Sequence, residues 1–177
     1  MGAGAGSAIL PTMRQLLLLR HGKAGTPAGG GDFERPLATR GRRDAKSLAG
    51  WLRAHGLEPD LIVTSSAARA QETAVCIANH LEQDSDGLAG NERLYLASPE
   101  TILSFVGNFS DTAHRVLLVG HNPGLAMLVS ALGEQPVSLP TATLAVLEFE
   151  GTWAGLSPGA ARLAHLVRPA DITPSAP

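Results

Sequence analysis

Cysteine is almost absent from this chain of 177 residues, in which Cys76 is the only example. One cysteine cannot form a disulfide within the chain, so the composition favours a reducing compartment, and we expect a cytoplasmic protein. Cys76 lies within a predicted helix, where a small and partly apolar side chain packs well. We therefore expect it to be a core residue and not a reactive thiol.

Long apolar runs and an excess of either charge are also missing. No stretch of 18 or more apolar residues occurs, so no membrane span is predicted. The 14 lysines and arginines nearly balance the 16 aspartates and glutamates, and the net charge of −2 indicates no basic surface for nucleic acid. We expect neither nucleic acid nor a membrane as a partner.

A convergent set of metal ligands is missing as well. Four histidines, His55, His80, His114 and His165, have no other ligand-type residue at a useful spacing. The other two histidines follow apolar strands in the company of arginines, whose charge would repel a cation. We predict no metal site and no cofactor.

The chain is long enough for one domain with a sizeable core, since 44% of its residues are hydrophobic. We predict a single domain over residues 13–168. Residues 1–12 are rich in Gly and Ala and lack the features of a secretion signal, and residues 169–177 are rich in Pro, Ala and Ser, so both are expected to be loose tails. Met1 and Met13 both remain candidates for the natural start, and a monomer is the default expectation.

Strand and helix patterns alternate along the domain, which predicts a three-layer α/β/α sandwich with a mostly parallel central sheet. Ser65 or Ser66 is expected to cap the second helix. Residues 153–159 are expected to form a hairpin loop or a flexible connection. Helices are predicted over Thr39–His55, Ala67–Gln83, Pro99–Phe109 and Leu125–Leu132, and late strands over Thr143–Phe149 and Arg162–Val167.

Basic side chains follow three of the apolar strands. Arg20 and His21 come directly after the first strand, Arg69 lies in the first turn of the helix after the second, and His121 follows the third. The carboxyl ends of parallel strands meet at one edge of a sheet, where ligands bind, so we expect these four side chains to lie together. Taken one at a time, Arg20 and His21 could belong to a polar turn, Arg69 could be a solvated surface residue, and His121 could be a structural histidine. The threefold recurrence favours a site, and the helix start with its arginine suits an anion.

The motifs around these residues resemble those of the histidine phosphatase superfamily, which has the phosphoglycerate mutase-like fold. Within that family the chain is most similar to the small SixA-type phosphohistidine phosphatases. The resemblance covers about Gln15 to Phe149. It is carried by Arg20–Ala24, by Asp32–Leu37 leading to Thr39 and Gly41, by Pro59–Asp60, by Ser65–Thr73 and by Gly120–Gly124.

The resemblance implies a role for each residue of the site. His21 would be the nucleophile that forms a phosphohistidine intermediate, which water then hydrolyses. Arg20 and Arg69 would hold the phosphoryl oxygens, and His121, if protonated, would add a third donor. A backbone carbonyl that accepts from one ring nitrogen of His21 would leave the other nitrogen free to attack. Substrate contacts are also expected from Gly22 and Asn122.

The acid that protonates the leaving group is harder to assign. In the mutase-like relatives it is a carboxylate after the second helix, and Glu92 is the nearest candidate here. Glu92 could equally be a surface residue paired with a neighbouring base, and Asp32, Glu34 and Asp111 are rivals on other loops. A phosphohistidine substrate needs less help from an acid, because imidazole leaves more easily than an alkoxide.

The segment from Lys23 to Arg35 is short and made of small residues, which predicts an open, shallow site. Such a site suits a phosphorylated protein side chain better than a small phosphate ester. Arg35 is expected either at the entrance or in a surface ion pair. The predicted function is a phosphatase that acts on phosphohistidine or another phosphorylated side chain. A phosphoglycerate mutase-like phosphotransferase and a non-catalytic phosphate-binding adaptor are the alternatives.

Overall fold

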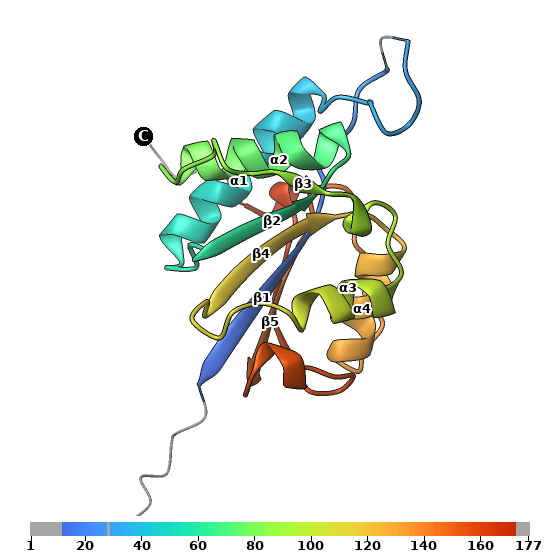
Figure 1. Cartoon of the computed structure of the whole chain (residues 1–177). Coiled ribbons are helices and arrows are strands. Elements are labelled where there is room, and N and C mark those ends of the chain that lie inside the picture. The colour runs from blue at the N-terminus through green and yellow to red at the C-terminus, as the bar shows by residue number, and fades with distance from the viewer. Residues whose placement is uncertain (1–11, 28, 173–177) are drawn as a thin grey trace, which may run out of the picture.

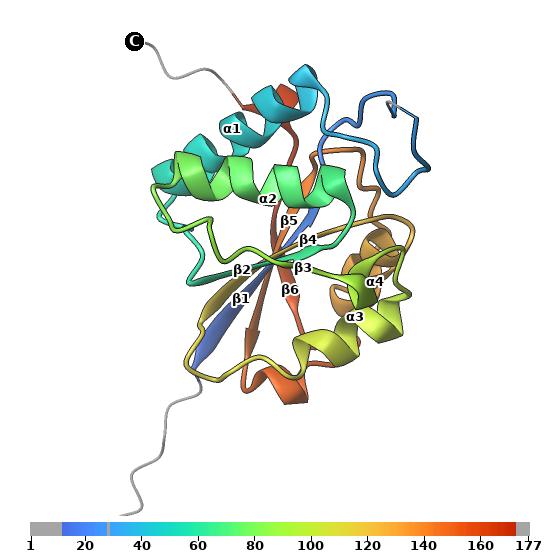
Figure 2. The same cartoon turned by 45° about the horizontal axis from the view of Figure 1, so that its top comes forward.

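The computed structural model describes residues 12–27 and 29–172 and has a six-stranded sheet between two layers of helices (Figure 1). Figure 2 shows α1 and α2 on one face of the sheet and α3 and α4 on the other. The expected three-layer α/β/α architecture is confirmed. The strands are β1 (Met13–Arg20), β2 (Leu61–Ser65), β3 (Gly90–Asn91), β4 (Arg115–Gly120), β5 (Leu144–Glu150) and β6 (Arg162–Val167), and the helices are α1 (Thr39–Ala54), α2 (Ala68–His80), α3 (Pro99–Val106) and α4 (Gly124–Leu132).

The strand order is β3-β2-β4-β1-β5-β6. The pairs β1–β4, β2–β4 and β2–β3 are parallel, whereas β5 is antiparallel to both β1 and β6. Among these six strands β5 alone therefore runs against the others, and the prediction of a mostly parallel sheet is confirmed.

The central strand β1 is buried on both faces, which explains its uninterrupted apolar run. Leu16 and Leu18 belong to the core beneath α3 and α4, and Leu17 and Leu19 belong to the core beneath α1 and α2. Alternate side chains of a strand point to opposite faces, so a strand covered on both sides needs apolar residues at every position. The apolar strand leaves Arg20 as the first polar side chain at its carboxyl end.

The pairing register brings the carboxyl ends of three strands to one edge. Arg20 lies opposite Gly120, and Thr64 lies opposite Val119. The segments that leave β1, β2 and β4 therefore begin side by side, although they are far apart in the sequence. This edge is where the sequence predicts a site.

The helices follow the predicted faces, with differences at their ends. α1 ends at Ala54, just before Gly56, whose positive φ of 64° suits the chain reversal there. α2 ends at His80, three residues before the predicted Gln83. The expected serine cap was wrong: α2 begins after Ala67, with no side-chain cap.

The predicted hairpin loop is confirmed, because residues 153–159 lie in the connection between the adjacent antiparallel strands β5 and β6. Trp153 opens a 3-10 helix, Trp153–Gly155, and its ring is buried against Phe109 and Phe149. The indole Nε1–H donates to the carbonyl of Ala113 at 2.8 Å, which satisfies the one polar group of the ring. Burial of so large a ring anchors this hairpin loop to the core.

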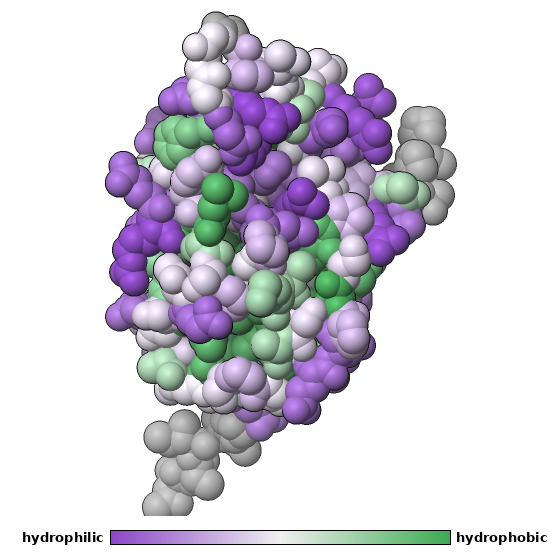
Figure 3. All heavy atoms as spheres, turned by 90° about the vertical axis from the view of Figure 1, so that its right-hand side faces the viewer, coloured by the Kyte–Doolittle hydropathy of each residue, from purple (hydrophilic) through white to green (hydrophobic). Residues whose placement is uncertain are grey.

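The predicted tails fall mostly outside the described residues, which leave out 1–11 and 173–177. Pro169–Asp171, assigned above to the C-terminal tail, form a 3-10 turn that contacts α1. No helix in the described part of the chain is long and apolar enough to cross a membrane. On the face that carries α3 and α4, hydrophilic side chains gather towards the top, and apolar and neutral side chains mix below (Figure 3).

Candidate active site

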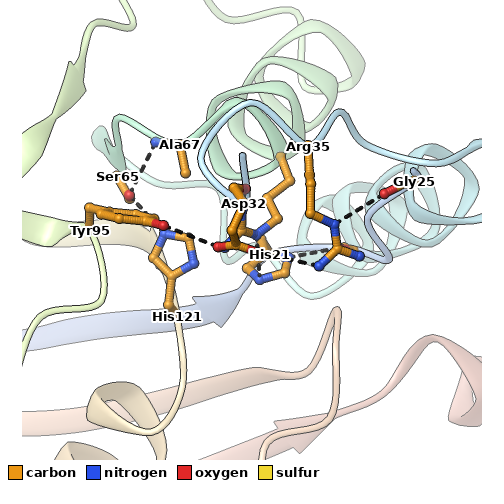
Figure 4. Close-up of polar contacts among 10 residues, drawn as sticks. His21, Gly25, Asp32, Arg35, Ser65, Ala67, Tyr95 and His121 are labelled. Atoms are coloured by element: carbon orange, nitrogen blue, oxygen red, sulfur yellow. Dashed lines mark hydrogen bonds and ion pairs between the residues drawn. The ribbon is translucent and has the colours of Figure 1, made fainter. Parts of the chain in front are cut away.

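A pocket of about 320 Å³ lies at the carboxyl edge of the sheet. It brings together most of the residues that the sequence predicts for the site, and Figure 4 shows several of them converging from separate loops. Gly22, a predicted substrate contact, is not among the lining residues; it packs closely on α1, since a Cβ atom there would lie 3.0 Å from the Gly41 backbone. The pocket is lined by Arg20, His21, Lys23, Ala24, Asp32, Arg35, Arg69, Leu96, His121, Asn122 and Thr141.

His21 is held in one orientation at the floor of this pocket, where the residue is 8% exposed. Its Nδ1 lies 2.8 Å from the carbonyl oxygen of Gly22, and its Nε2 lies 3.2 Å from Nε of Arg69. A carbonyl can only accept and an arginine N–H can only donate, so Nδ1 carries the hydrogen and Nε2 presents its lone pair. The carbonyl contact expected from the sequence is present.

The electrostatic surroundings keep the His21 ring neutral. Burial lowers the pKa of His21 to about 4, the charges of Arg69 and Arg20 act in the same direction, and the bond to the Gly22 carbonyl partly opposes them. At neutral pH Nε2 therefore carries a lone pair, as a nucleophile requires, and in the free protein this lone pair accepts from Nε of Arg69.

Two guanidinium groups make the pocket cationic. Arg69 is buried in the first turn of α2, and its Nη1 and Nη2 donate to Asp32, at 2.5 Å to the carbonyl oxygen and 2.8 Å to Oδ2. Nη1 of Arg20 donates to the carbonyl of Leu139 at 2.9 Å, and its buried Nε has no hydrogen-bond partner among the described residues. Arginine stays charged and matches two oxygens at once, so this pair suits a tetrahedral oxyanion.

His121 is buried beside His21, with the ring centroids 5.1 Å apart. Its Nε2 lies 2.8 Å from Oγ of Ser65, which also accepts from the backbone N–H of Ala67 at 3.3 Å. Burial, the neighbouring His21 ring and the charge of Arg69 lower the pKa of His121 to about 3. The sequence predicts a third donor from His121 if the ring is protonated, and in the free protein this lowered pKa leaves the ring neutral at neutral pH.

Comparisons with known proteins agree with this geometry. Residues 16–89 match the family model of the histidine phosphatase superfamily (branch 1). An uncharacterised protein of Mycobacterium tuberculosis is 35% identical over 156 residues, which cover 82% of this chain and 96% of that protein. The chain belongs to the histidine phosphatase superfamily.

The similarities within this superfamily point to its SixA-type members. A Nakamurella multipartitia structure that bears a provisional assignment as phosphohistidine phosphatase SixA superposes with a TM-score of 0.78 at 29% identity, over 90% of this chain and 99% of that one. Phosphohistidine phosphatase SixA of Escherichia coli is 25% identical over 144 residues, covering 80% of this chain and 89% of its own length. The protein is therefore a histidine phosphatase of the SixA type.

The structure does not place Glu92, the first candidate for the acid, at the pocket of this histidine phosphatase. Glu92 opens the 3-10 helix Glu92–Leu94, is exposed and does not line the pocket. Glu34 is also exposed, and Asp111 pairs with Arg14 at 2.8 Å. Of these four candidates the structure brings only Asp32 into the pocket.

Asp32 lies at the mouth of the phosphatase pocket, where its side chain is 50% exposed. Besides the bond from Arg69, it accepts from the hydroxyl of Tyr95 at 3.1 Å and from Nη1 of Arg35 at 3.3 Å (Figure 4). Both expectations for Arg35 hold, since it lines the entrance and also forms an ion pair.

Sequence reasoning missed Tyr95 and the side-chain role of Ser65. The Tyr95 ring meets His121 edge to face at 5.4 Å and Phe33 at 5.0 Å, so it links the loop of Asp32 to the site. Tyr95 is the only tyrosine of the chain, which was a signal that the sequence offered. No motif shows that Ser65 contacts His121 instead of capping a helix.

Proposed function

We propose that this phosphatase hydrolyses phosphohistidine, or another phosphorylated side chain of a protein, through a phosphohistidine formed on His21. One observation carries the proposal: Nε2 of His21 presents its lone pair at the floor of a pocket lined by two arginines, while Nδ1 is tied to the Gly22 carbonyl. A buried, neutral imidazole that is hydrogen-bonded at both ring nitrogens, in a cationic pocket, suits attack on a phosphoryl group.

The first step of the proposed reaction is an in-line attack by Nε2 of His21 on phosphorus. Arg20 and Arg69 bind the phosphoryl oxygens and balance their negative charge. The side chain of Asn122, held by a bond from Nδ2 to the carbonyl of Leu139 at 2.8 Å, completes the wall of the pocket. In the second step water attacks the phosphohistidine and releases phosphate.

His121 contributes to this mechanism as a neutral donor. In this proposal Oγ of Ser65 accepts from the N–H of Ala67 and donates its hydroxyl hydrogen to Nε2 of His121. That arrangement leaves the hydrogen of the ring on Nδ1, which is buried and has no hydrogen-bond partner among the described residues. An N–H without a partner beside the phosphoryl site is a ready donor to an oxygen that gains charge in the transition state.

The open mouth of the pocket favours a protein substrate. The side chains of Asp32 and Arg35 at the entrance are 50% and 38% exposed, so a group attached to a larger molecule can reach the floor from outside. The SixA names of the similar proteins support phosphohistidine as the first substrate to test.

The test is phosphate release from an aryl phosphate and from a phosphohistidine protein, with wild type and His21→Ala compared. We expect release to disappear in the variant, and rapid quenching of wild type to trap a phosphoenzyme that is labile in acid and stable in base. His55→Ala is the matched control, because His55 is exposed and stacks on Trp51 outside the pocket. Phosphate binding without release from either substrate would contradict the proposal and favour an adaptor.

A further inference from the structure

The Asp32 carboxylate occupies the arginine that the substrate needs. In the free protein Arg69 donates from Nη1 and Nη2 to Asp32 and from Nε to the nucleophile His21. These bonds use three of the five N–H groups of the guanidinium, and a phosphoryl group that binds beside His21 through the Nε and Nη2 edge competes with the carboxylate at Nη2. Since the backbone carbonyl of Asp32 can keep its own bond to Nη1, the exchange requires only a rotation of the side chain.

Asp32 also lies on the side from which the leaving group departs. His21 is at the floor of the pocket, 8% exposed, whereas the side chain of Asp32 is 50% exposed at the mouth. In an in-line displacement the attacking and leaving atoms are on opposite sides of phosphorus. Attack from the floor therefore sends the leaving atom towards the mouth, where the displaced carboxyl group of Asp32 would be.

The nearest charge to the Asp32 carboxylate changes from positive to negative when the phosphoryl group takes its place on Arg69. Partial burial acts to raise the pKa of Asp32, but the bonds from Arg69 and Tyr95 outweigh it and hold the pKa below its usual value. Loss of Arg69 to a phosphoryl dianion removes the larger of these bonds and places negative charge beside the carboxylate, and both changes favour protonation. The titratable and charged groups that face Asp32 are Arg20, His21, Lys23, Arg35, Arg69, Tyr95 and His121.

We propose that Asp32 exchanges with the phosphoryl group on Arg69, takes up a proton as it is displaced, and gives that proton to the leaving atom. The chemical step rests on the proposed function, whereas the exchange concerns binding alone. As the bond from His21 Nε2 to phosphorus forms, the bond to the leaving atom breaks, its electron pair stays on that atom, and the Asp32 carboxyl proton neutralises it. The Asp32 carboxylate then accepts a proton from the water that attacks the phosphohistidine. When phosphate leaves, Asp32 releases this proton to the solvent and returns to Arg69 as a carboxylate.

The exchange is tested with sulfate, a tetrahedral dianion that does not titrate in the neutral range. Sulfate affinity is measured by NMR titration at constant ionic strength between about pH 8 and about pH 5.5. We expect Asp32→Asn to bind sulfate about tenfold more tightly than wild type at the upper end, because the competing charge-assisted bond is gone. Wild-type affinity for sulfate should rise as the pH falls. The part of this rise that comes from protonation of Asp32 should be absent from Asp32→Asn, while the part that comes from His21 and His121 remains in both proteins.

Glu34→Gln is the matched control for this experiment. It removes the same charge two residues away, from an exposed side chain that does not line the pocket. We expect it to bind sulfate as wild type does. Equal sulfate affinities of wild type and Asp32→Asn, or equal gains in both variants, would overturn the exchange.

The proton transfer is tested with a series of aryl phosphates whose leaving groups differ in basicity. We expect Asp32→Asn to lower kcat about 100-fold or more for the most basic leaving group and much less for the most acidic. A uniform loss across the series would mean that Asp32 only supports the loop, and would overturn the transfer. Failure of the proposed function gives a different result, because His21→Ala would then keep the activity of wild type. The sulfate titration measures binding alone and does not depend on that outcome.

Discussion

At the scale of single residues, the proposed mechanism requires that Ser65 donates to Nε2 of His121, which leaves the ring hydrogen on Nδ1. Ser65→Ala removes the bond to Nε2, so we expect the ring to populate both neutral tautomers and kcat to fall about tenfold. ¹⁵N NMR of the imidazole reports the tautomer directly. Ser66→Ala is the control, because the buried Oγ of Ser66 has no hydrogen-bond partner within the described residues. An unchanged tautomer and an unchanged kcat in Ser65→Ala would show that the serine does not set the ring.

Residues at strand ends were predictable, and residues on loops were not. His21 and His121 follow apolar strands whose register fixes where they emerge, so the sequence was sufficient to bring them together. The position of Asp32 depends on the path of a segment without periodicity, and its bonds to Arg69 and Tyr95 are set only in three dimensions. The sequence therefore favoured Glu92, which the structure leaves on the surface outside the pocket.

At the scale of elements, the start of α1 supports the segment that follows the nucleophile. A Cβ atom at Gly41 would lie 2.5 Å from the carbonyl oxygen of Lys23 and 2.5 Å from Cδ1 of Leu37. Gly41→Ala must therefore shift the chain next to Gly22, and we expect it to reduce stability by about 1–3 kcal/mol and to lower kcat. Urea unfolding and steady-state kinetics measure the two effects.

Gly50, in the same helix, provides the comparison for Gly41. The nearest atom to a Cβ at Gly50 is Nε2 of His80 at 3.8 Å, an ordinary contact. Alanine is a better helix former than glycine, so Gly50→Ala should keep kcat and add up to about 1 kcal/mol of stability. Loss of activity in Gly50→Ala, or full activity and stability in Gly41→Ala, would contradict this account of α1.

The elements themselves follow from periodicity, and their exact ends follow from tertiary contacts. The sandwich buries the apolar run of β1 on both faces of the sheet and the apolar face of α1 against one of them. The 3-10 helix at Trp153 has no period to reveal it, because its one large ring is buried by residues distant in the sequence. Local composition predicted a hairpin loop or a flexible connection there, but it did not reveal the buried ring that anchors the loop.

At the scale of the whole molecule, the site makes stability depend on pH. The folded pKa values of His21 and His121 are about 4 and about 3, below the value of about 6.5 for an unfolded chain. Between about pH 6.5 and about pH 4 the unfolded chain therefore binds protons that the folded protein does not. Stability is greatest above this window and falls as the pH decreases through it, by as much as about 1.4 kcal/mol per pH unit for each ring.

Replacing both rings by neutral side chains should remove this dependence. The free energy of unfolding should fall between pH 6.5 and pH 5 in both proteins. We expect this fall to be roughly 2–3 kcal/mol smaller in the double variant His21→Asn, His121→Asn than in wild type. Urea unfolding at each pH measures the difference, with equal m-values as the condition for comparing the two proteins. The comparison uses the change with pH and not the absolute stability, since the substitutions also alter packing. Parallel losses in the two proteins would mean that His21 and His121 take up protons in the folded protein as readily as in an unfolded chain. Burial would then not keep the His21 ring neutral, and this account of the nucleophile would be wrong.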